Sequence, residues 1–273
     1  MARRLGVFRV LVHAVLIVGA VVSLFPFGWM ILTSFKSYRE VATGAVFPSV
    51  WRFSNYVEAW QSAPFARYFL NSIIMAASTV LGVLLTSTLA AYAFARLEFV
   101  GKNAIFNLFL ATMMIPGAIT LIPNFITIQR LGWYDTYLAL IVPWTASVFS
   151  IFLLRQFFAQ IPRDLYDAAL LDGCGHLRFL LTIVLPLSRA ALLSVALFTF
   201  IGSWNAFQWP LIVTAREVMR PIQVGLAVFT RESGTDTQLL MAAAAITILP
   251  IVALYFLVQR TFIEGIASTG IRG

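Results

Sequence analysis

Charged side chains are scarce in this chain, and their scarcity excludes an ordinary soluble domain. Lysine, arginine, aspartate and glutamate make up 11% of the 273 residues, whereas 60% are hydrophobic. A soluble domain carries about a quarter charged residues. Cys174 is the one cysteine, so no internal disulfide can form, and a Cys/His metal site has no ligand set. His13 and His176 lie far apart in sequence, and we interpret both as structural.

The few charges leave six long uncharged stretches. These stretches cover residues 10–35, 68–95, 103–129, 136–154, 190–215 and 237–259. A helix needs about 20 apolar residues to cross the hydrocarbon core of a bilayer. The sequence therefore predicts an all-α membrane protein, with six transmembrane helices in a single domain over residues 1–273. A β-barrel would show alternating segments of about ten residues, and the sequence has no such pattern.

The basic residues indicate the orientation only weakly. The first stretch is too long for the apolar region of a cleaved signal peptide, so we expect a retained anchor. Six spans put both termini on one side, and with inner termini the inner segments carry eleven basic residues against eight outside. The net charge of +8 fits basic loops that face anionic lipid headgroups. Without a Lys/Arg cluster, it does not indicate nucleic-acid binding.

The absence of charge inside the spans also bears on function. Secondary transporters and pumps place ionisable residues within the membrane, but these spans hold none except His13. No Ser/His/Asp grouping, carboxylate pair or metal-ligand spacing indicates a membrane enzyme. A permease that another protein energises needs a docking surface more than chemistry of its own. An ion-coupled transporter and a membrane scaffold remain the alternatives.

The loop over residues 160–188 is patterned as a docking element. Pro162 and Asp164 are typical of a helix start, because proline suits a first turn and acidic groups suit the positive end of the helix dipole. Gly173 stands where a left-handed residue ends a helix. We therefore expect a helix over residues 163–172. A second amphipathic piece, residues 177–185, is too short to span, and we expect it to lie at the interface until Pro186 breaks it. An ordinary amphipathic loop that packs under the bundle is the alternative.

The loop resembles the EAA loop of permeases from ATP-binding-cassette (ABC) importers. The matching residues are Asp167-Ala168-Ala169-Leu170-Leu171-Asp172-Gly173, then Phe179 and Leu185-Pro186-Leu187. Asp167 replaces the usual glutamate, and Cys174 replaces a common alanine. The resemblance implies that this is the cytoplasmic coupling helix, which contacts the ATPase subunit through Asp164, Tyr166, Asp167, Ala168, Ala169, Asp172 and Gly173.

Further segments are similar to the carbohydrate-uptake (MalG-like) group of these binding-protein-dependent permeases. They are Phe25-Pro26-Phe27-Gly28-Trp29-Met30, Ser34-Phe35-Lys36, Asn55-Tyr56, Asn71-Ser72, Ala91-Tyr92-Ala93-Phe94-Ala95-Arg96, Met114-Ile115-Pro116-Gly117, Gly202-Ser203-Trp204-Asn205, Gln259-Arg260-Thr261-Phe262-Ile263-Glu264-Gly265 and Gly270-Ile271-Arg272-Gly273. The resemblance implies a type I importer permease fold in the bacterial cytoplasmic (inner) membrane, with both termini in the cytoplasm.

The resemblance also implies the partners. They are a second related permease, an ABC ATPase dimer and an extracytoplasmic solute-binding protein, with a carbohydrate, polyol or glycerol-phosphate as the solute. Lys36 and Lys102 are the two lysines, and neither completes a Gly-x-x-x-x-Gly-Lys-Ser/Thr phosphate loop. We therefore expect the chain to be no enzyme and to hold no cofactor, with ATP and Mg²⁺ bound by the partner ATPase.

Polar residues near helix breakers are the candidates for the translocation pathway. They are Asn71, Ser72, Asn107, Asn205 and Gln208, with Pro116 and Pro210 nearby, and Trp204, Phe207 and Trp209 offer flat faces to a sugar ring. Polar groups in spans also commonly bond neighbouring helices, and tryptophan commonly marks the membrane interface. The sequence leaves both interpretations open.

Overall fold

The computed structural model describes residues 2–231 and 234–269, and it places side chains for residue 9, residues 11–230 and residues 234–259. The predicted Gly270-Ile271-Arg272-Gly273 match lies outside the described residues. The helices are α1 (Ala2–Ser34), α2 (Tyr38–Ala42), α3 (Ser54–Gln61), α4 (Phe65–Arg96), α5 (Lys102–Thr112), α6 (Gly117–Arg130), α7 (Tyr137–Ile141), η1 (Val142–Trp144), α8 (Val148–Gln160), α9 (Arg163–Leu171), α10 (His176–Phe179), η2 (Leu180–Val184), α11 (Leu185–Leu187), α12 (Arg189–Trp204), α13 (Gln208–Val213), η3 (Glu217–Met219), α14 (Ile222–Gly225), η4 (Leu226–Phe229) and α15 (Thr237–Thr269). Two short antiparallel strands, β1 (Thr230–Arg231) and β2 (Gly234–Thr235), form a hairpin.

The chain divides into two compact units. The first comprises residues 1–65 and 225–249, and the second comprises residues 66–224 and 250–273. Both candidate functional features described below lie in the second unit.

Three helices are individually long and apolar enough to cross a membrane. These segments are Leu11–Ser34, Phe65–Arg96 and Thr237–Gln259, and they match three of the six predicted spans. Three further pairs of helices qualify only if each bent pair counts as one span, which gives up to six. The chain is therefore a helical membrane protein, as predicted.

The remaining three uncharged stretches are not continuous helices, which corrects the expectation of simple spans. Residues 103–129 form α5 and α6, which are bent by 97°. Pro116 immediately precedes α6 and cannot donate the backbone hydrogen bond that would continue α5. Residues 136–154 are interrupted after η1, which contains Pro143, and the bend there is 41°.

The stretch over residues 190–215 also differs from the prediction. The helix α12 ends at Trp204, and α13 follows as a separate short helix from Gln208. The amphipathic piece before α12 forms the π-helical turn η2 and then the short helix α11, which contains Pro186, because proline is tolerated in a first turn. The break falls at Ser188, where the chain turns by 82° into α12.

In the first unit, hydrogen bonds fix the segment that follows α1. Asn55, a residue of the family resemblance, donates from Nδ2 to the carbonyl oxygens of Ser34 and Lys36, at 2.8 Å each. Lys36 is buried, and its Nζ lies 4.2 Å from the centre of the Trp29 ring. The end of α1 is thus fixed against α3, because a buried carbonyl without a donor would be unfavourable.

A capping box starts α2. The Ser37 Oγ accepts from the Glu40 N–H, and Glu40 Oε2 accepts from the Ser37 N–H at 2.7 Å. Hydrogen bonds from the Ser49 hydroxyl, from the Ser37 and Ser49 N–H groups and from the Ser37 hydroxyl lower the pKa of Glu40 to about 2. Glu40 therefore stays ionised even at pH values below the ordinary glutamate pKa, and its carboxylate connects residues 37 and 49.

Candidate functional site

The helix α9 has the ends that the sequence predicts. It starts after Pro162, with Asp164 in its first turn, and Gly173 beyond its last turn has a φ of +74°. The Gly173 N–H donates to the Leu170 carbonyl at 3.0 Å, and the Cys174 N–H donates to the Ala169 carbonyl at 2.8 Å. This pair of bonds is the Schellman arrangement, which a left-handed glycine allows. The helix and its glycine end are confirmed.

The predicted coupling residues separate onto two faces of α9. Ala169 is buried, and the Tyr166 ring stacks on His176 with centres 5.5 Å apart and meets the edge of Phe179 at 5.1 Å. Exposed side chains cover the other face; they are Asp164, Asp167, Ala168, Leu171 and Asp172. Tyr166 and Ala169 therefore hold the helix on the rest of the unit, and the acidic face is exposed.

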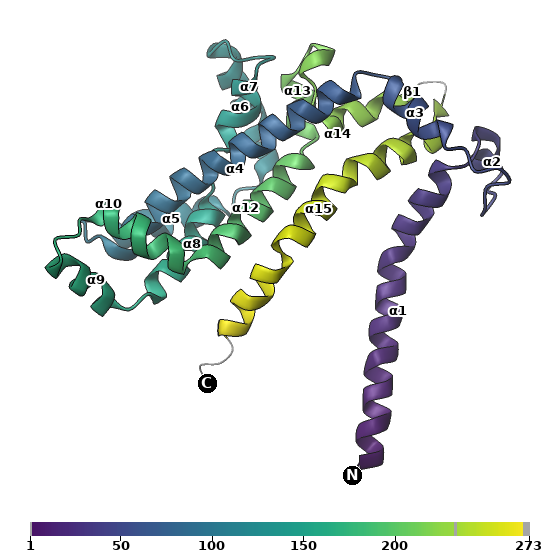
Figure 1. Cartoon of the computed structure of the whole chain (residues 1–273). Coiled ribbons are helices and arrows are strands. Elements are labelled where there is room, and N and C mark those ends of the chain that lie inside the picture. Colours follow the sequence, from purple (N-terminus) through teal and green to yellow (C-terminus); the bar gives the residue numbers. More distant parts are fainter. Residues whose placement is uncertain (1, 232–233, 270–273) are drawn as a thin grey trace. The chain divides into compact units, whose positions relative to one another are not determined.

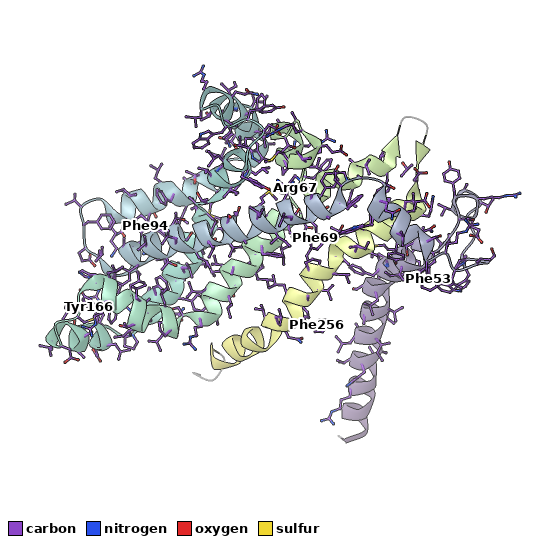
Figure 2. The ribbon with its side chains drawn as sticks, turned by 45° about the horizontal axis from the view of Figure 1, so that its top comes forward. Phe53, Arg67, Phe69, Phe94, Tyr166 and Phe256 are labelled. Atoms are coloured by element: carbon purple, nitrogen blue, oxygen red, sulfur yellow. The ribbon has the colours of Figure 1, made fainter. Side chains whose placement is uncertain are left out.

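The end of α4 anchors the base of α9. Within the second unit, α9 and α10 lie at the end of α4 that carries Phe94 (Figures 1 and 2). One guanidinium nitrogen of Arg96 donates to the carbonyl oxygens of Phe158 and Ile161. The Tyr92 hydroxyl lies 3.1 Å from His176 Nδ1, which also lies 3.2 Å from the Tyr166 hydroxyl. His176 thus connects two tyrosines, which agrees with its predicted structural role.

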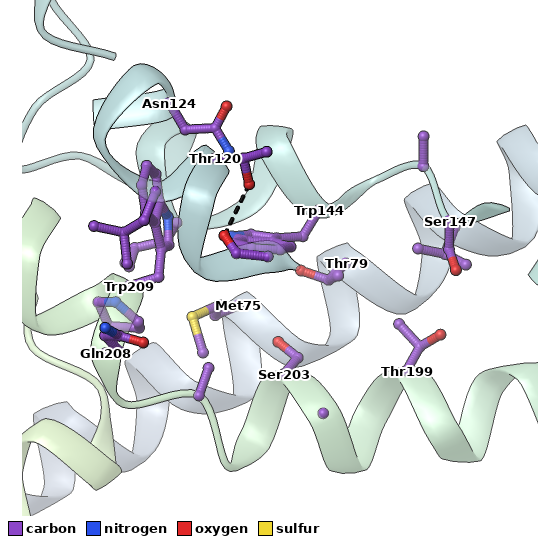
Figure 3. Close-up of a pocket in the computed structure, with 18 of the residues that line it drawn as sticks. Met75, Thr79, Thr120, Asn124, Trp144, Ser147, Thr199, Ser203, Gln208 and Trp209 are labelled. Carbon is purple, nitrogen blue, oxygen red and sulfur yellow. Dashed lines mark hydrogen bonds between the residues drawn. The ribbon is translucent and has the colours of Figure 1, made fainter. Parts of the chain in front are cut away.

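A cavity of about 740 Å³ lies elsewhere in the same unit. Its lining comes from six α-helices and η1, with Met75 and Thr79 on α4, Asn124 on α6 and Ser203 on α12. In Figure 3, Trp144 of η1 lies between Thr120 and Asn124 on one side and Thr79 on the other. Every lining residue is described by the structure, and none is Asp, Glu, Lys, Arg or His.

The cavity takes in three of the eight pathway candidates that the sequence predicts, Phe207, Gln208 and Trp209. Pro210 lines it as well. Asn71, Ser72, Trp204 and Asn205 do not line it. Trp204 is buried between Phe69 and Phe200, with ring centres at 5.3 Å and 5.5 Å, and Asn107 is exposed on α5.

Asn71 and Ser72 instead hold the loop around η3. Asn71 Nδ2 donates to the carbonyl oxygens of Val218 and Arg220, at 2.8 Å and 3.0 Å, and its Oδ1 accepts from the Tyr137 hydroxyl at 2.6 Å. The Ile222 N–H donates to Ser72 Oγ at 2.8 Å. Both side chains are fully buried, and their polar groups stabilise the loop. Asn205 accepts a hydrogen bond from Gln223, at 3.3 Å.

An ion pair joins the two loops next to α7 and α13. Arg216 Nε donates to Asp135 Oδ2, and the N–H groups of Ala215 and Arg216 donate to Asp135 Oδ1 at 3.0 Å and 3.2 Å. Burial by itself raises the pKa of Asp135, but these hydrogen bonds outweigh it and hold the pKa below its ordinary value. Asp135 therefore stays ionised at neutral pH, and Arg216 neutralises it.

The family of the chain follows from its sequence. A family model described as "Binding-protein-dependent transport system inner membrane component" matches residues 82–267, which include the cavity lining from Val83 onward and the whole of α9. The chain belongs to this family. It is thus a permease of the bacterial inner membrane and a transport component, not an enzyme.

Two relatives with assigned names match this permease over nearly its whole length. The diacetylchitobiose uptake system permease protein NgcG of Streptomyces coelicolor is 34% identical over 96% of this chain and 88% of its own length. The sn-glycerol-3-phosphate transport system permease protein UgpE of Yersinia enterocolitica is 34% identical over 94% of this chain and 95% of its own. Both are named as permease subunits, which agrees with the resemblance inferred from the EAA loop.

A solved structure shares the fold. It is a bacterial ABC transporter involved in the import of the acidic polysaccharide alginate, and one of its chains superposes with a TM-score of 0.84. That match is 24% identical in sequence and covers 94% of this chain and 96% of the other. The permease therefore has an ABC importer permease fold, as the sequence predicts.

Sequence reasoning missed most of the cavity lining. Thr79, Asn124, Trp144 and Ser147 line the cavity, but none was among the predicted residues. A local signal existed for two of them, because Asn124 follows Pro123 and Trp144 follows Pro143. Proline interrupts backbone hydrogen bonding and favours a bend, and bends in membrane helices open space for polar groups.

Proposed function

We propose that this permease forms half of the translocation pathway of an ABC importer for a carbohydrate, polyol or glycerol-phosphate. A second homologous permease supplies the other half, and an extracytoplasmic solute-binding protein delivers the solute. The names of NgcG and UgpE support a solute in this range. The uncharged cavity is this chain's contribution to the pathway.

One observation carries the proposal: α9 is fixed on one face and free on the other. Its inner face is held by Tyr166 and Ala169, whereas Asp164, Asp167, Ala168 and Asp172 are exposed. A helix held in this way can transmit a displacement, caused by a partner bound to its exposed face, to the core of the permease. We propose that the exposed face docks on an ABC ATPase dimer, which binds the ATP and Mg²⁺.

We further propose six spans with both termini in the cytoplasm. Each bent helix pair then counts as one span. The two short helices of a pair can cross the membrane together, because neighbouring helices satisfy the backbone groups that the bend leaves without hydrogen bonds. In this topology the loop after α1 is outside, and the residues around Gly101 and α9 are inside.

Cysteine labelling tests this topology. In a Cys174→Ala background, Val46→Cys should react with an impermeant maleimide added to intact cells, whereas Asn103→Cys and Gly175→Cys should react only after the cells are opened. All three positions are exposed, so a lack of reaction reports the membrane side and not burial. Labelling at position 103 in intact cells would contradict the proposed topology.

Reconstitution tests the function itself. The chain alone in liposomes should neither hydrolyse ATP nor accumulate a sugar, and uptake should appear only with the second permease, the ATPase and the binding protein together. The measurement is radiolabelled solute inside the liposomes, with ATP enclosed or omitted. Uptake by the chain alone in response to an ion gradient would refute the proposal in favour of a secondary transporter.

A further inference from the structure

The cavity carries information about the charge of its solute. It has no charged lining residue. The ion pair of Asp135 with Arg216 lies outside this lining and is already neutralised by its own partners. A phosphate or carboxylate that loses water against this lining gains no counter-charge from this chain, and burying an unpaired ion is strongly unfavourable. A neutral solute meets no such penalty.

The polar groups of the cavity suit hydroxyl groups. Thr79 is buried, and its Oγ1 has no hydrogen-bond partner among the described residues, although it lies in the cavity wall. Asn124 is half-buried and Gln208 is exposed, and the side chains of both line the same space. Hydroxyls and amides both donate and accept, as sugar hydroxyls do, whereas a phosphate or carboxylate at neutral pH mainly accepts.

Two aromatic pairs complete the lining. Trp144 and Trp209 meet edge to face with ring centres 6.0 Å apart, and Phe149 and Phe198 do so at 6.2 Å. The Trp209 N–H donates to the Ala139 carbonyl at 2.9 Å, so this ring is held in place and uses its polar group within the protein. Ring faces of this kind offer apolar contact to the C–H side of a sugar, and a few fixed polar groups orient it.

We propose that this cavity binds a neutral sugar unit and discriminates against phosphorylated or uronic-acid solutes. Thr79, Asn124 and Gln208 bond its hydroxyls, and Trp144 packs against its ring. The inference rests on the proposed function, which leaves neutral and anionic solutes open, and narrows it.

The test compares two probes that differ in one group. Methyl β-glucoside and methyl β-glucuronide differ by a hydroxymethyl against a carboxylate. Binding of each to the full chain in lipid nanodiscs is followed by saturation-transfer NMR, which detects affinities in the millimolar range. The glucoside should give saturable transfer and the glucuronide little or none. Equal or stronger transfer to the glucuronide, or none to either probe, would overturn the inference.

Substitutions locate the binding and separate it from folding. Thr79→Val should weaken glucoside binding about two- to tenfold, the value of one neutral hydrogen bond. It should not lower the thermal stability of the chain, because the Thr79 hydroxyl has no partner to lose among the described residues. Thr127→Val is the matched control, since its hydroxyl bonds the Pro123 carbonyl and lies outside the cavity. Equal binding by Thr79→Val and the unmodified chain would contradict the assignment.

A gain-of-function variant tests whether the cavity selects its solute by charge or by shape. Gln208→Arg brings a cation to the cavity wall and should raise glucuronide binding to the level of the glucoside.

Failures of the two proposals are distinguishable in the reconstituted importer. ATP-driven uptake of a uronic acid would keep the proposed function and refute the neutral-sugar inference. Glucoside binding without ATP-driven uptake of any solute would keep the neutral-sugar inference and refute the proposed function.

Discussion

Gly173→Val should abolish transport while the chain still reaches the membrane in normal amounts. Gly173 has a φ of +74°, and a side chain with a Cβ in this region costs about 1–2 kcal/mol, with more for a β-branched residue. No atom lies within 4 Å of a Cβ added there, so the cost comes from the backbone and not from a clash. The end of α9 should then unwind or turn, and the exposed acidic face should lose its geometry.

The neighbouring glycine provides a matched control. Gly175 also has open space around an added Cβ, but its φ of −73° suits any residue. Gly175→Val should therefore transport normally. Gly173→Asn should be intermediate, because asparagine tolerates the left-handed region better than other residues with a Cβ.

The measurement is coupled activity in the assembled importer. ATP hydrolysis is followed with and without loaded binding protein, beside solute uptake, in nanodiscs and proteoliposomes. Gly173→Val should lose stimulated hydrolysis and uptake together. Normal coupling in Gly173→Val would mean that α9 does not transmit the energy of ATP hydrolysis.

Gly82→Val should prevent the chain from accumulating in a folded form. A Cβ at Gly82 would lie 2.6 Å from Thr145 Cγ2 and 2.8 Å from Thr145 Cβ, distances that packed atoms do not reach. Thr145 cannot turn aside easily, because its hydroxyl bonds the Val142 carbonyl and its own carbonyl accepts from Thr86 Oγ1 at 2.7 Å. Overpacking costs about 1–3 kcal/mol for an added methylene, and valine adds more than one carbon.

The level of folded protein in detergent and its thermal midpoint measure this effect. Gly19→Val serves as the control, since Gly19 lies in α1 with no atom within 4 Å of an added Cβ. A Gly82→Ala chain should be less affected than Gly82→Val, and adding Thr145→Gly, which removes both clashing atoms, should restore it. Unchanged stability of Gly82→Val would show that α4 and η1 do not pack as closely as described.

The helix α9 is the part of the functional site that the sequence predicts best. Its signals are local: Pro162 and Asp164 at the start and Gly173 at the end act within one or two turns of the backbone they affect. The two faces of α9 were not predictable in the same way. Which of Tyr166 and Asp167 turns inward depends on His176 and Phe179, which pack against Tyr166 from the segment after the helix.

The candidate pathway shows the opposite case. Asn71 looks like a polar residue available to a solute, because nothing near it in sequence uses its amide. Its partners, Val218, Arg220 and Tyr137, come from distant segments that only the folded chain brings together. Thr79 looks ordinary in sequence, yet the fold leaves its hydroxyl buried and without a partner in the described structure.

The amino-acid sequence by itself determined that this chain is a membrane protein, where its apolar stretches lie, and where α9 begins and ends. Those properties depend on composition and on contacts within a few residues. Only the tertiary structure decided that two of the stretches bend and a third is interrupted after Trp204, that Asn71 and Ser72 serve the loop around η3, and that an uncharged cavity forms around Trp144. These properties depend on side chains from distant segments, whose hydrogen bonds and packing are settled when the helices meet.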